Sequence, residues 1–303
     1  MKIAVPDLIS NSYFPAVAAA ELGMFKAEGV DMTLELLFPV DKTYEAMRDH
    51  EIDFVAGSAH SALAAFPEWK GAKLICAQAQ HMYWFLVVRS DLKPKRGDLT
   101  ILKGKRIGAA PWVDMGLQQL LLAGGMKAGD VEIMPVPGAV GKSVNFGLTA
   151  AQALIDGKID GFWANGMAAE IAVEAGAGTV VVDARRGEGP AGCINYTMSS
   201  IATTDELIAR DPAQVAAVVR AIVRTQKALC DNPSLAEEVG KKVFPAHEAG
   251  LITNLIRRDL PYYRPEITEE FVKGMNAFSR NVGILKGDPK YNEVVATQFR
   301  NEW

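Results

Sequence analysis

Hydroxyl and amide side chains gather where two apolar, strand-like segments of the chain end. Three follow the segment KIAV, and three small residues belong to the segment IDFVAGSAHS: Ser10, Asn11 and Ser12, then Gly57, Ser58 and Ser61. A helix is expected to begin at each place, where a hydroxyl can cap it and free backbone N–H groups can bind an anion. Because capping alone explains only one of these side chains, we expect ligand contacts here, with Ser58 and Ser61 meeting a carboxylate, sulfonate or phosphate oxygen.

Aromatic residues are concentrated in the loops that follow the expected strands. In a chain with 8% aromatic residues, these loops contain Tyr13, Phe14, Tyr83, Trp84, Trp112, Trp163 and Tyr196. Such rings can stack on a flat or apolar molecule, although a single ring is more often part of the core. We expect the ligand to contact Tyr13, Trp84, Trp112 and Trp163, with Tyr83 and Asn165 beside them.

Two histidines and one aspartate are the candidates for acid/base chemistry. His60 and His81 lie in expected cleft loops, and Asp114 lies in a third loop. Either histidine can donate a hydrogen bond to an anion, and with Asp114 either can transfer a proton. Histidines with structural hydrogen bonds are commoner than catalytic ones. We therefore expect these three residues to contact the ligand and assign no catalytic residue.

Motifs of several enzyme classes are incomplete or absent. The segment PGAVGKS, residues 137–143, resembles a phosphate-binding loop, but Val136 occupies the position of its first glycine. No GxSxG nucleophile motif occurs. The three cysteines and four histidines show no metal-ligand spacing. The sequence predicts neither a metal nor a cofactor.

The composition excludes further classes of function. Of 303 residues, 49% are hydrophobic and 22% are charged, as in globular proteins. The net charge of −4, with both signs interspersed, argues against nucleic acid as a partner. No stretch reaches the ~20 apolar residues of a membrane span, and no signal peptide follows Met1. We expect a cytoplasmic protein as the sequence stands, or a periplasmic one if a leader has been removed.

Short β-branched segments alternate with longer helical ones, which predicts parallel βαβ units. A polar, basic stretch at 91–106 interrupts the alternation and predicts a linker or hinge. The outline of AMRDHEIDFVAGSAH returns in ALIDGKIDGFWANGM, which indicates two lobes built on one plan. In open α/β sheets, ligands lie at the carboxyl ends of the strands. This rule collects the loops named above in one cleft.

The order of these segments resembles that of the type II periplasmic binding proteins of ABC transporters. The opening strand is followed by Pro15, Ala19, Gly23, Phe25, Gly29 and Val30, as in the NMT1/THI5-like branch, which includes sulfonate, taurine and thiamin-pyrimidine-precursor binders. IDFVAGSAHSAL resembles the second ligand loop of that branch, and LKGKRIGAAPW its entry to the second lobe. GKIDGFWAN resembles its third loop, and IATTDELIARDPAQVAAVVRAIVRTQ its return to the first lobe. The resemblance covers nearly the whole chain.

This resemblance implies an α/β fold of two lobes, each a mainly parallel sheet flanked by helices. Lobe 1 would comprise residues 1–92 and 198–303, and lobe 2 residues 93–197. The ligand would lie in the cleft between them, and the lobes would close by hinges near 88–97 and 193–203.

The implied function is that of a solute-binding protein. It would capture a small organic molecule with an anionic or polar head and present it to an ABC permease, as a monomer. A sulfonate, an aromatic carboxylate and a nitrogen heterocycle all remain open as ligands. Two other functions remain open as well. One is an enzyme on the same fold, such as a decarboxylase of small aromatic or heterocyclic substrates, using His60 or His81 with Asp114. The other is a cytoplasmic ligand sensor.

Overall fold

The first five-stranded sheet is assembled from both ends of the chain. The structure, a computed structural model, describes residues 1–139, 141 and 144–303. In the order β2-β1-β3-β10-β4, the strands of this sheet are Thr33–Leu36, Lys2–Val5, Phe54–Ser58, Ser199–Thr204 and Ala72–Ala79. Strand β10 runs antiparallel to both of its neighbours, whereas β1 is parallel to β2 and β3. This sheet forms the centre of lobe 1.

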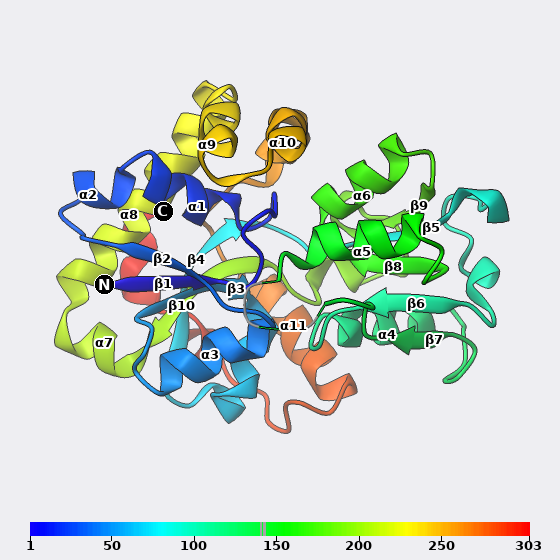
Figure 1. Cartoon of the computed structure of the whole chain (residues 1–303). Helices are drawn as coiled ribbons and strands as arrows, with labels where there is room; N and C mark the ends of the chain where they lie inside the picture. The colour runs from blue at the N-terminus through cyan, green and yellow to red at the C-terminus, as the bar shows by residue number, and fades with distance from the viewer. Residues whose placement is uncertain (140, 142–143) are drawn as a thin grey trace.

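The second sheet repeats the plan of the first and forms the centre of lobe 2 (Figure 1). In the order β7-β6-β8-β5-β9, its strands are Glu132–Met134, Arg106–Ala109, Gly161–Ala164, Phe85–Arg89 and Gly178–Asp183. Strand β5 is the antiparallel member, in the place that β10 holds in the first sheet. Each lobe therefore completes its sheet with a strand from a segment that crosses from the other lobe. The repeat between AMRDHEIDFVAGSAH and ALIDGKIDGFWANGM is confirmed, because β3 and β8 occupy equivalent positions.

The position of β5 changes the expected boundary between the lobes. Residues 85–89 were expected in lobe 1, but they pair with β8 and β9 in the second sheet. The chain therefore crosses between the sheets within residues 80–84. The hinge expected near 88–97 was placed too far along the chain. The polar stretch at 91–106 contains the short 3₁₀-helices Ser90–Leu92 and Leu99–Leu102 and belongs to the part of the chain beyond this crossing. The return segment precedes β10, and a hinge near 193–203 stays a prediction.

Helices flank both sheets. In lobe 1 they are α1 Phe14–Glu21, α2 Met24–Ala27, α3 Val40–Arg48, α7 Asp205–Arg210, α8 Pro212–Asp231, α9 Leu235–Val243, α10 Ala246–Asp259, α11 Glu269–Asn281 and α12 Tyr291–Val294. In lobe 2 they are α4 Asp114–Ala123, α5 Phe146–Ile155 and α6 Gly166–Glu174. Helix α10 packs against α6 of the other lobe, as Figure 1 shows above the two sheets.

The sequence explains where several helices begin and end. Asp211 caps α8 by accepting a hydrogen bond from Gln214 N–H, and Pro212 follows at the first helical position. The helix expected to begin after Ser12 ends before Gly23, whose φ of +71° a helix interior does not allow, and α2 follows. The expected helix after IDFVAG is a 3₁₀-helix, Ala59–Ala64.

Candidate ligand-binding site

A small cavity lies between the lobes, at the carboxyl ends of the parallel strands. Lobe 1 and the crossing segment contribute Pro6, Asp7, Tyr13, Phe38, Val40, Tyr83 and Trp84, and lobe 2 contributes Ala110, Val113, Phe146, Ala164 and Asn165. The cavity measures about 40 Å³, which is room for only a few water molecules. The lobes must therefore separate before an organic ring can enter.

Asp7 is the polar centre of this cavity. It follows β1 and is 5% exposed. Its Oδ2 accepts hydrogen bonds from the backbone N–H of Gly147, at 3.0 Å, and from Nδ2 of Asn165, at 2.9 Å, both in lobe 2. Burial raises the pKa of Asp7 to about 6, although the hydrogen bonds that it accepts favour the charged form. The Asp7 carboxylate thus joins the lobes and remains mainly ionised at pH 7.

Asn165 is held in position by the helix that it caps. Its Oδ1 accepts the N–H of Ala168 at 3.1 Å, as an N-cap side chain does at the start of a helix. This bond fixes the amide so that Nδ2 faces Asp7. The local cap of α6 therefore determines which group lobe 2 presents to the carboxylate.

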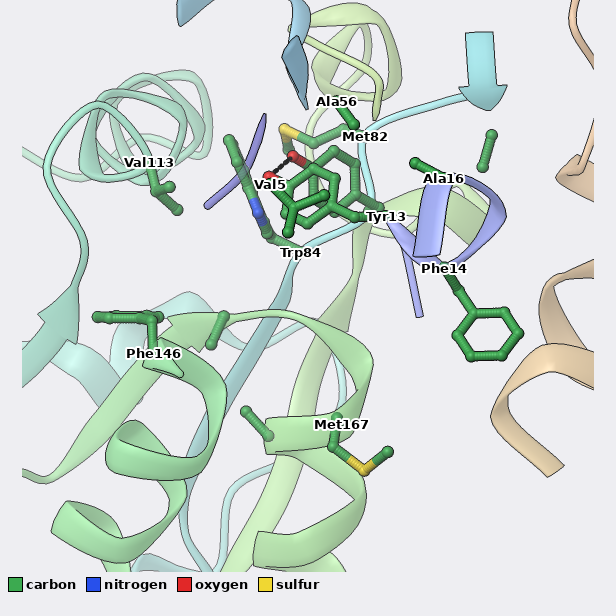
Figure 2. Close-up of a cluster of buried hydrophobic side chains, with 14 of the residues drawn as sticks. Val5, Tyr13, Phe14, Ala16, Ala56, Met82, Trp84, Val113, Phe146 and Met167 are labelled. Atoms are coloured by element: carbon green, nitrogen blue, oxygen red, sulfur yellow. Dashed lines mark hydrogen bonds between the residues drawn. The ribbon is translucent and has the colours of Figure 1, made fainter. Parts of the chain in front are cut away.

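Two tyrosines and a tryptophan form one wall of the cavity. The hydroxyl groups of Tyr13 and Tyr83 are hydrogen-bonded at 2.6 Å, and burial raises the pKa of both phenols. The ring of Tyr83 lies 5.0 Å from that of Trp84, measured between centroids. Figure 2 shows Tyr13 beside Trp84, with Phe146 and Val113 on elements of the other lobe. This wall offers ring faces together with neutral hydroxyl groups.

Phe38 and Phe146 form a stacked pair across the lobe boundary. Their centroids are 5.7 Å apart and their planes differ by 15°. Both rings line the cavity, and both also line an outer groove of about 340 Å³ with Pro39, Pro111, Pro135 and Val136. The stacked pair therefore separates the inner cavity from the groove.

His60 makes a second contact between the lobes and does not itself line the cavity. It is fully buried after β3; its Nδ1 lies 3.0 Å from the Thr197 hydroxyl and its Nε2 3.0 Å from the Trp112 carbonyl oxygen of lobe 2. Burial lowers the pKa of His60 to about 4, so the ring is neutral at pH 7. Both ring nitrogens are occupied by structural hydrogen bonds.

A buried ion cluster forms a third contact. Arg185, 2% exposed in lobe 2, donates from Nη1 to Asp259 Oδ2 in lobe 1 at 2.6 Å. Arg186 donates to the other carboxylate oxygen at 3.2 Å. Asn11 donates its amide to Asp259 and accepts the N–H of Gly166 at 3.1 Å, so this cluster continues to the start of α6. Ion pairs and hydrogen bonds of this cluster thus hold the lobes together beside the cavity.

The structure brings four of the fifteen expected ligand residues to the cavity. These four are Tyr13, Tyr83, Trp84 and Asn165. The expected hydroxyl groups lie elsewhere: Ser58 and Ser61 are hydrogen-bonded to each other at 2.6 Å and are fully buried. Ser10 and Ser12 are also buried and do not line the cavity, and Gly57 packs against Val40, Val55 and Tyr44. Asn11 lies in the ion cluster described above.

The remaining expected residues surround the site without lining it. Trp163 is fully buried with its ring 6.0 Å from that of Trp84. Trp112 has a left-handed φ of +68° and presents its carbonyl to His60. Among the described residues, Asp114 is not hydrogen-bonded to a histidine; its carboxylate accepts from Gln118, and His81 lies against the ring of Tyr262. His60, His81 and Asp114 therefore form no acid/base pair in this arrangement.

The expected set omitted residues that line the site. Asp7, Phe38, Val113 and Phe146 were missing from it, and so was the Arg185–Asp259 pair beside the cavity. Asp7 and Phe38 follow β1 and β2 directly, so the rule of strand ends already pointed to them. No signal in the sequence predicts that Arg185 meets Asp259, because the two are 74 residues apart.

The described residues contain neither a metal-binding cluster nor a helix that could span a membrane. No group of three or more His, Cys, Asp and Glu side chains in this part of the chain could hold a metal ion. No helix among the same residues combines the length and apolar character needed to cross a bilayer. The segment expected to mimic a phosphate-binding loop includes residues 140, 142 and 143, which lie outside the described residues.

Comparison with known proteins gives one consistent result. The riboflavin-binding protein RibY of Chloroflexus aurantiacus is 23% identical, over 98% of this chain and 85% of RibY. The alkanesulfonate-binding protein SsuA of Xanthomonas axonopodis pv. citri, bound to MOPS, has the same fold. Its TM-score is 0.74 at 12% identity, over 99% of this chain and 96% of SsuA.

An enzyme shares the fold as well. The desulfurization enzyme DSZB has a TM-score of 0.65 at 16% identity, over 99% of this chain and 98% of DSZB. Two-lobed periplasmic binding proteins and this enzyme thus show the fold and leave the ligand open. The family model described as NMT1/THI5 like matches residues 10–236. The chain belongs to the NMT1/THI5-like family.

Proposed function

We propose that the protein captures a flat, largely apolar ring compound between its lobes and presents it to an ABC-type importer. A solute-binding role is supported by the family and by relatives that are ABC-type binding proteins. The single observation that carries the choice of ligand is the cavity itself. The cavity lies between the lobes, and aromatic side chains from both lobes surround one buried carboxylate, that of Asp7.

The stacked Phe38–Phe146 pair supports a flat ligand. One ring comes from each lobe, and the planes are nearly parallel at 15°. A planar molecule that enters between them would replace one ring contact by two, which favours closure around it. Separation of the pair would also connect the inner cavity with the outer groove of about 340 Å³. The combined space suits a ring system with a substituent that points outward.

The expected anionic head finds less support than the ring. Ser10, Ser12, Ser58 and Ser61 are buried and do not line the cavity, and the described residues that line it include neither lysine nor arginine. The relatives include a riboflavin-binding protein and an alkanesulfonate-binding protein. Of these two chemistries, the aromatic lining favours a ring compound such as a flavin or another nitrogen heterocycle.

Delivery to a membrane permease and a periplasmic location are parts of the same proposal. Both rest on the binding proteins among the relatives, and a monomer rests on the same family precedent. The alternative, an enzyme on this fold, rests on DSZB alone. Acid/base catalysis has little support, because the ring nitrogens of His60 already have structural partners.

The test is a binding experiment that also detects chemistry. The pure protein is incubated with a pool of flavins, pyrimidines, aromatic carboxylates and alkanesulfonates, and bound and free compounds are weighed by mass spectrometry. Small-angle scattering on the same samples measures closure. Retention of a ring compound with unchanged mass supports the proposal. Retention of alkanesulfonates alone would overturn the ring ligand, and accumulation of a product of different mass would identify an enzyme.

A further inference from the structure

The Asp7 carboxylate occupies the place where an anionic ligand would otherwise bind. Helix α5 begins at Phe146, and its second residue, Gly147, points its free backbone N–H at Asp7 Oδ2, 3.0 Å away. Such N–H groups, with the positive end of the helix dipole, favour a negative group. Here that group comes from the opposite lobe of the protein itself. The second donor, Asn165 Nδ2, is aimed at the same oxygen at 2.9 Å.

We propose that Asp7 determines the charge selectivity of the cavity, so that it accepts neutral or cationic rings bearing an N–H donor and rejects anions. This inference rests on the proposed function and specifies its ligand. Nitrogen heterocycles with an amino or imide N–H, and planar amidinium compounds, have the chemistry that fits. Sulfonates, carboxylates and nitrate do not.

The hydrogen-bond capacity of Asp7 leaves room for such a donor. Two carboxylate oxygens offer about four acceptor positions. The structure fills three of them, since Oδ1 accepts Ile9 N–H at 3.1 Å and Oδ2 accepts the two bonds from lobe 2. One acceptor position therefore remains for a ligand, and Asp7 lines the cavity where that ligand would lie. An anion brought to the same place would meet an acceptor and a like charge.

No positive group in the lining offsets the charge of Asp7. Of the twelve residues around the cavity, all within the described part of the chain, only Asp7 is ionised at neutral pH. Its hydroxyl neighbours Tyr13 and Tyr83 have raised pKa values and stay neutral. Lys42 lies on the outer groove, and its ammonium group is paired with Glu45 at 2.6 Å. Arg185 lies behind the wall, with its guanidinium 5.7 Å from the centroid of the Tyr83 ring, and is paired with Asp259. A negative ligand would thus be desolvated beside a carboxylate that no cation in the lining compensates, which is costly.

The experiment uses probes that share a shape and differ in charge. Benzamidine, benzamide and benzoate are planar rings of similar size with a cationic, a neutral and an anionic head. Their affinities for the full chain are measured by ligand-observed NMR at pH 7.5. The variants are Asp7→Ala, which removes the carboxylate, and Asp7→Asn, which removes its charge. Asp53→Asn makes the same charge change at the opposite end of the same sheet, where Asp53 accepts Lys2 N–H. Circular dichroism checks that each variant is folded.

The expected result is a preference of about tenfold or more for benzamidine over benzoate in the native chain. The preference should disappear in both Asp7 variants and persist in Asp53→Asn, with benzoate gaining affinity in Asp7→Ala. Equal or tighter binding of benzoate by the native chain would overturn the inference and leave the ring-binding function standing. An unchanged preference in folded Asp7 variants would overturn it too. If the native chain bound none of the probes and none of the ring compounds in the pool, the proposed function itself would fall.

Discussion

The contacts made by Asp7 and His60 join the lobes at equivalent places in the two sheets. Asn165 follows β8 in lobe 2 and bonds to Asp7, which follows β1 in lobe 1. His60 follows β3 in lobe 1 and bonds to Trp112, which follows β6 in lobe 2. In both cases the loop after the central strand of one sheet, β3 or β8, reaches the loop after the strand beside the central one in the other sheet, β6 or β1. The same architecture is thus used twice, with opposite chemistry.

The difference lies in what surrounds each contact. His60 is packed edge to face against Trp84 and Phe278, at 6.2 and 5.4 Å between centroids, and both ring nitrogens have partners. Asp7 lies beside empty space and keeps an acceptor position free. One copy of the contact is therefore filled and stabilises the closed form. The contact at Asp7 has an acceptor position without a partner, and a ligand in the cavity can donate a hydrogen bond to it.

The largest effect on stability is expected from removing the buried ring of His60. His60→Ala removes a buried ring and leaves the Trp112 carbonyl and the Thr197 hydroxyl without their partner. Such a change costs about 2–4 kcal/mol of stability, measured as a shift in the urea unfolding curve. His247→Ala, on an exposed side chain of helix α10 with a surface ion pair to Glu174, is the control and should change stability by about 1 kcal/mol or less. Equal effects of the two variants would show that the His60 contact is not a packed one.

Acidification should act on the two contacts in opposite directions. Burial raises the pKa of Asp7 to about 6, so its contribution to the stability of the folded chain is complete below 3.8 and is lost as pH rises through 6. Burial lowers the pKa of His60 to about 4, although the bond to Trp112 acts the other way, so its contribution is present above 6.5 and is lost as pH falls towards 4. Each slope is at most about 1.4 kcal/mol per pH unit and proton.

The opposite effects of pH on Asp7 and His60 are measured with single variants. Urea unfolding between pH 4 and 7 should show that Asp7→Asn loses more stability on acidification than the native chain, because the opposing contribution of Asp7 is then absent. The variant His60→Gln should lose less stability than the native chain, because the destabilising protonation of His60 is then absent. Parallel pH profiles for the two variants would contradict the opposite effects assigned to these groups.

A smaller effect is expected at the stacked pair that closes the cavity. Phe38→Ala removes one ring of the Phe38–Phe146 stack and should weaken the binding of a ring ligand about three- to tenfold, since an aromatic pair contributes ~0.5–1.5 kcal/mol. The rings of Tyr196 and Phe278 are also stacked, with centroids 4.7 Å apart, and neither ring lines the cavity. Tyr196→Ala should therefore lower stability without changing affinity. Calorimetric titration of both variants checks this, and equal losses of affinity would contradict the role of Phe38.

The smallest effect is expected from the buried hydroxyl groups. Ser58 and Ser61 bond to each other, so Ser61→Ala should cost about 1 kcal/mol or less of stability. Ligand contact by these serines stays a prediction from the sequence, and affinity decides it. A tenfold loss in Ser61→Ala would show that the lobes bring this hydroxyl group to the ligand after all. An unchanged affinity would indicate that the ligand binds in the cavity beside Asp7 without contacting Ser61.

The loops that meet at the site could be predicted, because strand ends are local features, but most of the residues that line it could not. Alternating apolar segments and turn residues mark where β1, β3 and β8 stop, and Tyr13, Trp84 and Asn165 stand in the loops that follow or cross. Which of those side chains face the cavity is decided by helix rotation and by neighbours far along the chain. Ser58 and Trp163 occupy similar loops, yet both are enclosed by the packing around them.

The sequence by itself determined the two-lobe plan, its internal repeat, the loops that meet between the lobes and the family. These follow from periodicity and from the order of motifs, which are properties of short segments. Only the tertiary structure decided that β5 completes the second sheet, that Arg185 meets Asp259, and that Asp7 lies at the N-terminus of α5. Asp7 and Gly147 are 140 residues apart. Long-range pairings of this kind depend on how the strands assemble and how the two lobes pack, which no local pattern encodes.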